Sequence, residues 1–225
     1  MTTRLIEILP LALGVALNPL GITIAIVLSG RPGGIRAGAA YAAGVTGGLA
    51  LALGLAHLLA FRHFSRRIDD PRIDVAKVDL AVGVVILLWA AWTIYAGRRK
   101  SSGGLSDKVL KLAVHLSPLQ LIGLGIGQAL ASGKNLALAG AAGAKIEADQ
   151  PGIATAVVSL LLFLLVAVAP LLVPLLIASK GGSTANARLD SLNVWVRDHL
   201  PMLAGVSLLI LGVGLVQSGL SHLLH

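Results

Sequence analysis

Long apolar runs, separated by short polar and charged segments, dominate the chain. The run Ser159-Leu-Leu-Leu-Phe-Leu-Leu-Val166 shows no alternation of polar and apolar positions, whereas transmembrane strands alternate over about ten residues. A helix needs about 20 apolar residues to cross a hydrocarbon core of about 30 Å. We therefore predict an all-α integral membrane protein with six transmembrane helices, at residues 5–28, 37–60, 80–97, 119–143, 153–178 and 202–224.

Composition supports one membrane domain over residues 1–225. Of the 225 residues, 56% are hydrophobic and 12% are charged, and the mean hydropathy is +0.88, while a soluble chain carries about 25% charged residues. The absence of cysteine excludes disulfides, thiolate nucleophiles and cysteine metal sites. We expect no enzymatic activity, no catalytic residues, no cofactor and no metal site.

The net charge is +8, and the charged residues lie mainly between the apolar runs. We therefore expect membrane lipids rather than nucleic acid as partners. Ten Lys and Arg residues lie on the face that holds the loop at 98–117, and seven lie on the other face. Because Lys and Arg favour the cytoplasmic side, we expect both termini outside.

Two basic segments between the apolar runs have helical patterns. Leu105, Val109, Leu112 and Leu116 share one helical face. Leu189, Leu192 and Val196 form a similar face beside Trp195. These segments predict either helices in the headgroup layer or ordinary loop helices that cover the bundle.

Two apolar runs are interrupted near their middles, the first by Asn18-Pro19 and the fourth by Ser132-Gly-Lys-Asn135. Aligning Ala16-Leu-Asn-Pro-Leu-Gly21 with Leu130-Ala-Ser-Gly-Lys-Asn135 pairs the interruptions at a shift of 114 residues, or three spans. An odd number of spans inverts the second unit. We predict an inverted 3+3 repeat with broken helices 1 and 4, comprising residues 1–97, a basic cytoplasmic loop at 98–117, and residues 118–225.

The breaks suggest a substrate site at the membrane midplane. Asn18 and Ser132 are suited to cap the half-helices that begin at Pro19 and Gly133. Two exposed half-helix N-termini that approach each other attract an anionic group. The alternative is that Pro19 and Gly133 are kinks tolerated by packing.

Lys134 lies beside the second break, where a charge costs about 2.5 to 3.5 kcal/mol on insertion scales. A substrate anion, carbonyl groups freed at the breaks, or loss of its proton would each compensate that cost. Alternatively, Lys134 is a fixed part of the architecture. The predicted substrate-binding residues are Asn18, Pro19, Gln128, Ser132, Gly133, Lys134 and Asn135.

Other polar and small residues carry weaker predictions. Tyr41 is a further site candidate, and His57 and Lys134 are candidates for proton coupling. The glycines of Gly44-Val-Thr-Gly-Gly48 and Gly123-Leu-Gly-Ile-Gly127 favour close helix packing, and less directly a homodimer.

Two segments resemble the hallmark segments of the lysine-exporter superfamily, and within it the sulfolipid-1-addressing or peptidoglycolipid-addressing protein family. They are Leu9-Pro-Leu-Ala-Leu-Gly-Val-Ala-Leu-Asn-Pro-Leu-Gly21 and Leu130-Ala-Ser-Gly-Lys-Asn-Leu-Ala-Leu-Ala-Gly-Ala-Ala-Gly143. The family's second motif usually reads Asn-Pro-Lys-Asn, and here Ser132-Gly133 replaces Asn-Pro. The resemblance implies export of an envelope glycolipid or related amphiphile across the bacterial plasma membrane.

Three functions remain open on the sequence. The first is a secondary transporter or flippase of an anionic amphiphile. The second is an exporter of small solutes such as amino acids or cations, although the spans hold no acid in their cores. The third is a non-transporting accessory subunit of a lipid synthase or of the envelope export machinery.

Overall fold

The computed structural model describes residues 2–64, 83–84, 87–88, 90–92, 95, 105–148 and 153–224. These residues are almost entirely helical and include no strand, as the apolar runs predict. The helices with complete boundaries are α1 (Thr2–Ala16), α2 (Pro19–Ser29), α3 (Gly34–Phe64), α5 (Leu105–His115), α6 (Pro118–Ala131), α7 (Gly133–Ala148), α8 (Ile153–Ser179), α9 (Gly182–Asp198) and α10 (Leu200–Leu224).

Two to four candidate membrane spans are present among the described residues, and the predicted six are not confirmed. Gly34–Leu55 in α3 and Ala154–Ser179 in α8 are each long and apolar enough to cross a membrane. Two further spans are possible only if two helices bent at a break count as one span. These pairs are Ile8–Ala16 with Pro19–Ser29, bent by 55°, and Gly182–Asp198 with Pro201–Gly214, bent by 65°. The predicted fourth span is divided into α6 and α7, which are short because Ser132 interrupts them, and the predicted third span falls largely outside the described residues.

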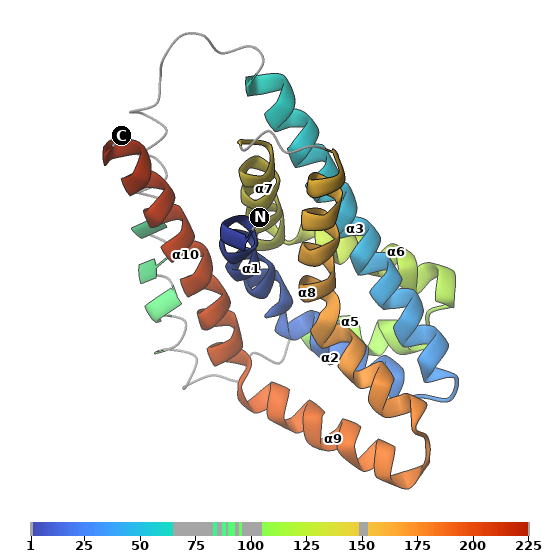
Figure 1. Ribbon diagram of the computed structural model, residues 1–225. Helices are drawn as coiled ribbons and strands as arrows, with labels where there is room; N and C mark the ends of the chain where they lie inside the picture. Colours follow the sequence, from blue (N-terminus) through green and yellow to red (C-terminus); the bar gives the residue numbers. More distant parts are fainter. Residues whose placement is uncertain are drawn as a thin grey trace.

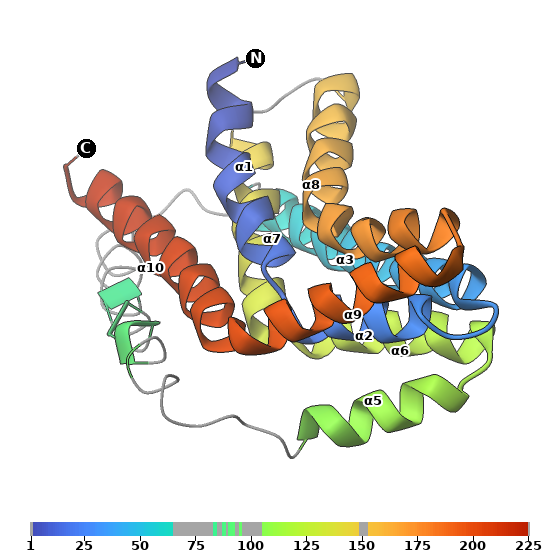
Figure 2. The same cartoon turned by 90° about the horizontal axis from the view of Figure 1, so that it is seen from below.

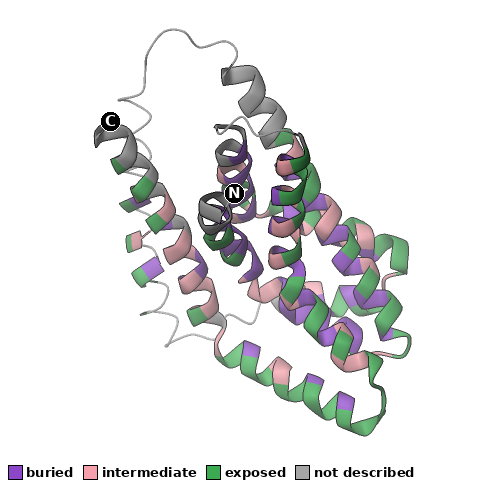
Figure 3. Cartoon of the chain, in the orientation of Figure 1, coloured by how far each residue is buried: buried purple, intermediate pink, exposed green. Residues whose placement is uncertain are grey.

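The outer surface of the bundle is apolar along α8, as a lipid-facing helix requires. Four exposed leucines recur at helical spacing on one side of this helix, where Figure 3 shows exposed positions along its length. They are Leu161, Leu165, Leu172 and Leu176. A soluble protein rarely leaves such a continuous apolar stripe uncovered.

One or more glycines of each small-residue motif lie at the close contact between α3 and α6. A Cβ atom added to Gly44 would lie 2.8 Å from the Ile122 Cα, and one added to Gly125 would lie 2.5 Å from the Tyr41 carbonyl oxygen. Real Cβ atoms do not approach backbone so closely. The predicted role in close packing is confirmed for Gly44. In the second motif Gly125 makes the contact, whereas a Cβ atom on Gly123 or Gly127, which carry the predicted spacing, would meet nothing within 4 Å. The homodimer stays a prediction.

The helices around the two breaks occupy the middle of the molecule. α1 and α7 lie side by side between α10 and α8 (Figure 1). α3 packs against α6 and α7, while α8 packs against α1 and α2. Both predicted loop helices are present, as α5 beneath α2 and as α9 (Figure 2), and their position relative to a membrane stays a prediction.

Candidate functional site

The first break separates α1 from α2 at the residues that the sequence indicates. α1 ends at Ala16, and α2 begins at Pro19 after a bend of 55°. Asn18 has an extended backbone, and its side-chain Oδ1 accepts a hydrogen bond from the Gly21 N–H at 3.4 Å. Pro19 occupies the first helical position, where its missing N–H costs nothing. A local Asn-Pro signal therefore starts α2 inside the apolar run.

The second break repeats this pattern with a hydroxyl in place of an amide. Ser132 has an extended backbone between α6 and α7, and its Oγ accepts a hydrogen bond from the Asn135 N–H at 3.3 Å. The Ser132 carbonyl accepts from the Leu136 N–H at 3.0 Å, as the Asn18 carbonyl accepts from the Ile22 N–H at 3.0 Å. Ser132 therefore caps α7, although Ser132-Gly133 stands where the second motif usually has Asn-Pro.

Lys134 joins the second break to the first. Its Nζ donates to the carbonyl oxygens of Gly14 at 2.8 Å and Leu17 at 3.1 Å. The Gly14 oxygen is free because the N–H of Asn18, which would continue the helix, instead donates to the Ala16 carbonyl at 2.8 Å. The ammonium group thus lies at the negative end of α1, with carbonyl groups as its partners rather than an open anion site.

A second polar cluster surrounds Gly21 in the first turn of α2. Tyr41 of α3 is fully buried, and its hydroxyl donates to the Gln128 Oε1 of α6. A Cβ atom on Gly21 would lie 3.3 Å from the Gln128 Nε2 and 3.4 Å from both the Asn18 Nδ2 and the Tyr41 hydroxyl. The absence of a side chain at Gly21 therefore lets polar side chains of the first break, α3 and α6 meet.

Asn135 provides a polar atom without an internal partner. Its side chain is 1% exposed, and its Oδ1 has no hydrogen-bond partner among the described residues. Leaving a buried acceptor unpaired costs about 1–3 kcal/mol. A buried amide that bears this cost beside a helix break is suited to accept a hydrogen bond from a ligand.

The predicted site residues lie at the two breaks or in the polar cluster around Gly21, with the exception of His57. His57 lies in α3, but its side chain falls outside the described residues, so its predicted role stays untested. Tyr41 was only a weak candidate from the sequence, and Gly21, Gly14 and Leu17 were not predicted as site residues. Gly21 acts through the space it leaves, and Gly14 and Leu17 act through main-chain carbonyls, which no residue pattern reveals.

Comparison with known proteins identifies the family. No curated protein and no solved structure matches the chain. A family model described as Sap, sulfolipid-1-addressing protein, matches residues 8–221, which is nearly the whole chain and includes both breaks. The chain therefore belongs to the sulfolipid-1-addressing protein family.

Proposed function

We propose that this protein is a secondary membrane transporter, acting as an exporter or a flippase, for an anionic amphiphile such as an envelope glycolipid. The family description names a sulfolipid, whose headgroup is both anionic and polar. The apolar helices give the chain a membrane location. In this proposal it lies in the bacterial plasma membrane with both termini outside, as a member of the lysine-exporter superfamily.

The contact between Lys134 and the carbonyl groups of Gly14 and Leu17 carries the proposal. It brings two breaks, far apart in the sequence, into one place. Both half-helices that start at the breaks have free N–H groups and a positive dipole end in their first turns. An anionic headgroup is stabilised at such ends, where broken helices also bind substrates in other transporter folds.

The side chains around the breaks suit the polar part of a headgroup. Amides of Asn18, Gln128 and Asn135 both donate and accept hydrogen bonds, as sugar hydroxyl groups require. Pro19, Ser132 and Gly133 shape and cap the breaks around them. Lys134 holds the two breaks together, and either Lys134 or His57 is the proposed proton carrier.

The reciprocal packing of helices supports the proposed inverted repeat. α3 of the first unit packs against α6 and α7, and α8 of the second unit packs against α1 and α2. An inverted pair of three-span units, at residues 1–97 and 118–225, would produce this exchange. Alternating access would then take the form of one unit rocking against the other around the breaks.

Envelope lipids of a deletion strain test the proposal. The strain is restored with wild type, Asn135→Ala, Lys134→Met or the control Lys180→Met, which removes an exposed lysine in the turn after α8. We expect outer-envelope glycolipid to return with wild type and the control, and not with either site variant at equal protein level. Full restoration by Asn135→Ala would contradict the site. Restoration by every variant would favour an accessory subunit of a lipid synthase or export complex.

A further inference from the structure

The hydrogen-bond acceptors at the start of α2 are paired within the chain. The Asn18 carbonyl accepts from the Ile22 N–H at 3.0 Å, and the Asn18 Oδ1 accepts from the Gly21 N–H at 3.4 Å. The Pro19 carbonyl accepts from the Thr23 hydroxyl at 2.8 Å. A ligand at the first break therefore finds these acceptors already in use.

Tyr41 fixes the orientation of the next polar group, the side-chain amide of Gln128. The Tyr41 side chain is fully buried, and among the described residues its hydroxyl has the Gln128 Oε1 as its acceptor. The opposite orientation of the amide would set an NH₂ group against this hydroxyl and leave a buried O–H without an acceptor. The hydroxyl therefore holds the Gln128 amide with its Nε2 as the free end. A hydrogen bond accepted at Oε1 also makes that NH₂ group a stronger donor.

Three donors remain unpaired at the break. The Gln128 Nε2, the Asn18 Nδ2 and the Leu20 N–H donate to no acceptor among the described residues. The point where a Cβ atom of Gly21 would lie is 3.3 Å from the Gln128 Nε2 and 3.4 Å from the Asn18 Nδ2. Because N–H···O hydrogen bonds are about 2.9 Å long, one group with several oxygen atoms can accept from both amides.

The surroundings suit a negative charge and leave the donors accessible. Neither α2 nor α6 contains an acidic residue. The carbonyl groups at the end of α1, which would repel an anion, are covered by the Lys134 ammonium. All three donor residues are partly exposed. A Cβ atom on Gly127, the residue before Gln128, would meet nothing within 4 Å, so open space adjoins the break.

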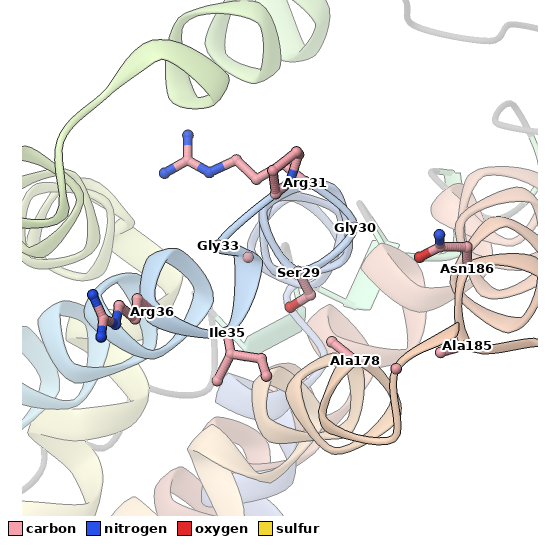
Figure 4. A pocket seen from close by; sticks show the side chains of 12 residues that line it. Ser29, Gly30, Arg31, Gly33, Ile35, Arg36, Ala178, Ala185 and Asn186 are labelled. Carbon is pink, nitrogen blue, oxygen red and sulfur yellow. The ribbon is translucent and has the colours of Figure 1, made fainter. Parts of the chain in front are cut away.

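The other end of α2 lacks such a set of unpaired donors. A pocket of about 670 Å³ opens there, and Ser29, Arg31, Arg36 and Ala178 are among its lining residues (Figure 4). The Arg31 guanidinium donates to carbonyl groups at the end of α5. In Figure 4 the guanidinium groups of Arg31 and Arg36 extend away from the space between Ser29 and Ala178. The first break is therefore the end of α2 that is suited to an acceptor-rich ligand.

We propose that Tyr41 is a positioning residue that fixes Gln128 as a hydrogen-bond donor. With Gln128 held in this way, the first break selects a headgroup that carries an oxyanion, such as sulfate or phosphate, over the same headgroup without it. This role rests on the proposed function, because it concerns the specificity of the same site. The oxygen atoms of the anion accept from Gln128, Asn18 and Leu20, and such hydrogen bonds to a charged group are stronger than those to a neutral hydroxyl.

Binding of two lipids that differ only by a sulfate group tests the proposal. Full-length protein in phosphatidylcholine nanodiscs receives sulfatide or galactosylceramide, and native mass spectrometry measures the retained lipid. We expect wild type to bind sulfatide about tenfold more tightly than galactosylceramide.

Two variants act on the donor, and one serves as the control. Tyr41→Phe should lower the ratio of the two affinities about fivefold and leave galactosylceramide binding unchanged, because the Gln128 amide becomes free to turn. Gln128→Glu should abolish the preference, since it keeps the acceptor for Tyr41 and replaces the NH₂ group by a negative oxygen. Tyr95→Phe removes the hydroxyl of a tyrosine that is 73% exposed, and it should keep the wild-type ratio.

Equal retention of the two lipids by wild type, or retention of neither, would overturn the proposal. A wild-type ratio in Tyr41→Phe or in Gln128→Glu, or equal losses in Tyr41→Phe and Tyr95→Phe, would overturn it as well. Restoration of envelope glycolipid in the deletion strain tests the proposed function separately. Selective binding without restoration would reject transport alone, and restoration without selective binding would reject the role of Tyr41 alone.

Discussion

The Lys134 side chain on α7 donates a hydrogen bond to the main-chain oxygen of Gly14 on α1, 120 residues earlier in the chain. This bond uses a carbonyl group that became free because α1 ends at the following turn. A half-buried ammonium and an unpaired helix end, each costly alone, thus compensate each other. The same bond holds the two halves of the chain together at their breaks.

Lys134→Met should destabilise the protein by about 2 kcal/mol, because it leaves the carbonyl groups of Gly14 and Leu17 without their donor. The measurement is the thermal unfolding midpoint of the purified protein in detergent. Lys180→Met, which changes an exposed lysine, should unfold at the wild-type temperature. Equal midpoints for Lys134→Met and wild type would show that the ammonium does not stabilise the break.

Asn135→Ala should abolish most lipid export while leaving the stability of the protein nearly unchanged. The variant removes a buried oxygen that has no partner among the described residues, and this relief offsets the small cavity it creates. We expect a free energy of unfolding within about 1 kcal/mol of wild type and a large loss of lipid export. A marked drop in stability would instead identify Asn135 as a structural residue.

Gly21→Ala should impair export with little loss of stability. The added methyl group would press on the Gln128 amide at 3.3 Å and on the Tyr41 hydroxyl at 3.4 Å, so the polar cluster must shift. Gly47→Ala is the matched control, because a Cβ atom there meets nothing within 4 Å. Export assays of both variants at equal expression check this expectation. Wild-type export by Gly21→Ala would exclude the cluster from the site.

Gly125→Ala should destabilise the contact between α3 and α6. Its Cβ atom would lie 2.5 Å from the Tyr41 carbonyl oxygen and 2.7 Å from the Val45 nitrogen, which are backbone atoms that cannot turn away. Such overpacking costs about 1–3 kcal/mol. On the same helix, a methyl group at Gly123 meets nothing within 4 Å, so Gly123→Ala serves as the control. The unfolding midpoints of the two variants should differ clearly, and equal midpoints would contradict the packing.

Arg31→Gln should release α5 from the end of α2. The Arg31 guanidinium donates to carbonyl oxygens of Ala113 at 3.4 Å and Leu116 at 3.2 Å, and also to that of Val114. These groups form the negative end of α5, which a cation stabilises. Hydrogen exchange over residues 105–115 should therefore become faster in Arg31→Gln and not in Arg188→Gln. Unchanged exchange would show that α5 is held by other contacts.

The sequence predicted the helices and both breaks because these depend on local chemistry. Helix length follows from apolar run length, and Asn18 and Ser132 carry the caps in their own side chains. The number of spans does not follow from local chemistry in the same way. The short α6 and α7 pack against α3 within the bundle. An apolar run of this kind is equally suited to packing in a protein core and to facing lipid, so the run alone does not distinguish the two.

The partners of Lys134 lay beyond prediction for a physical reason. Every residue carries a carbonyl group, so the acceptors at Gly14 and Leu17 have no signature until the fold brings α7 to the end of α1. The pocket beside Ser29 likewise depends on where α9 begins relative to α3. Both features arise from contacts between distant segments.

Translocation of a fluorescent, sulfated glycolipid in proteoliposomes tests the central claim most directly. Chemical quenching of the outer leaflet reports how fast the labelled lipid crosses the bilayer. We expect wild type and Lys180→Met to accelerate the crossing, and Asn135→Ala to leave it at the rate of protein-free liposomes. Crossing at the protein-free rate with wild type, or acceleration by Asn135→Ala equal to that of wild type, would contradict the account.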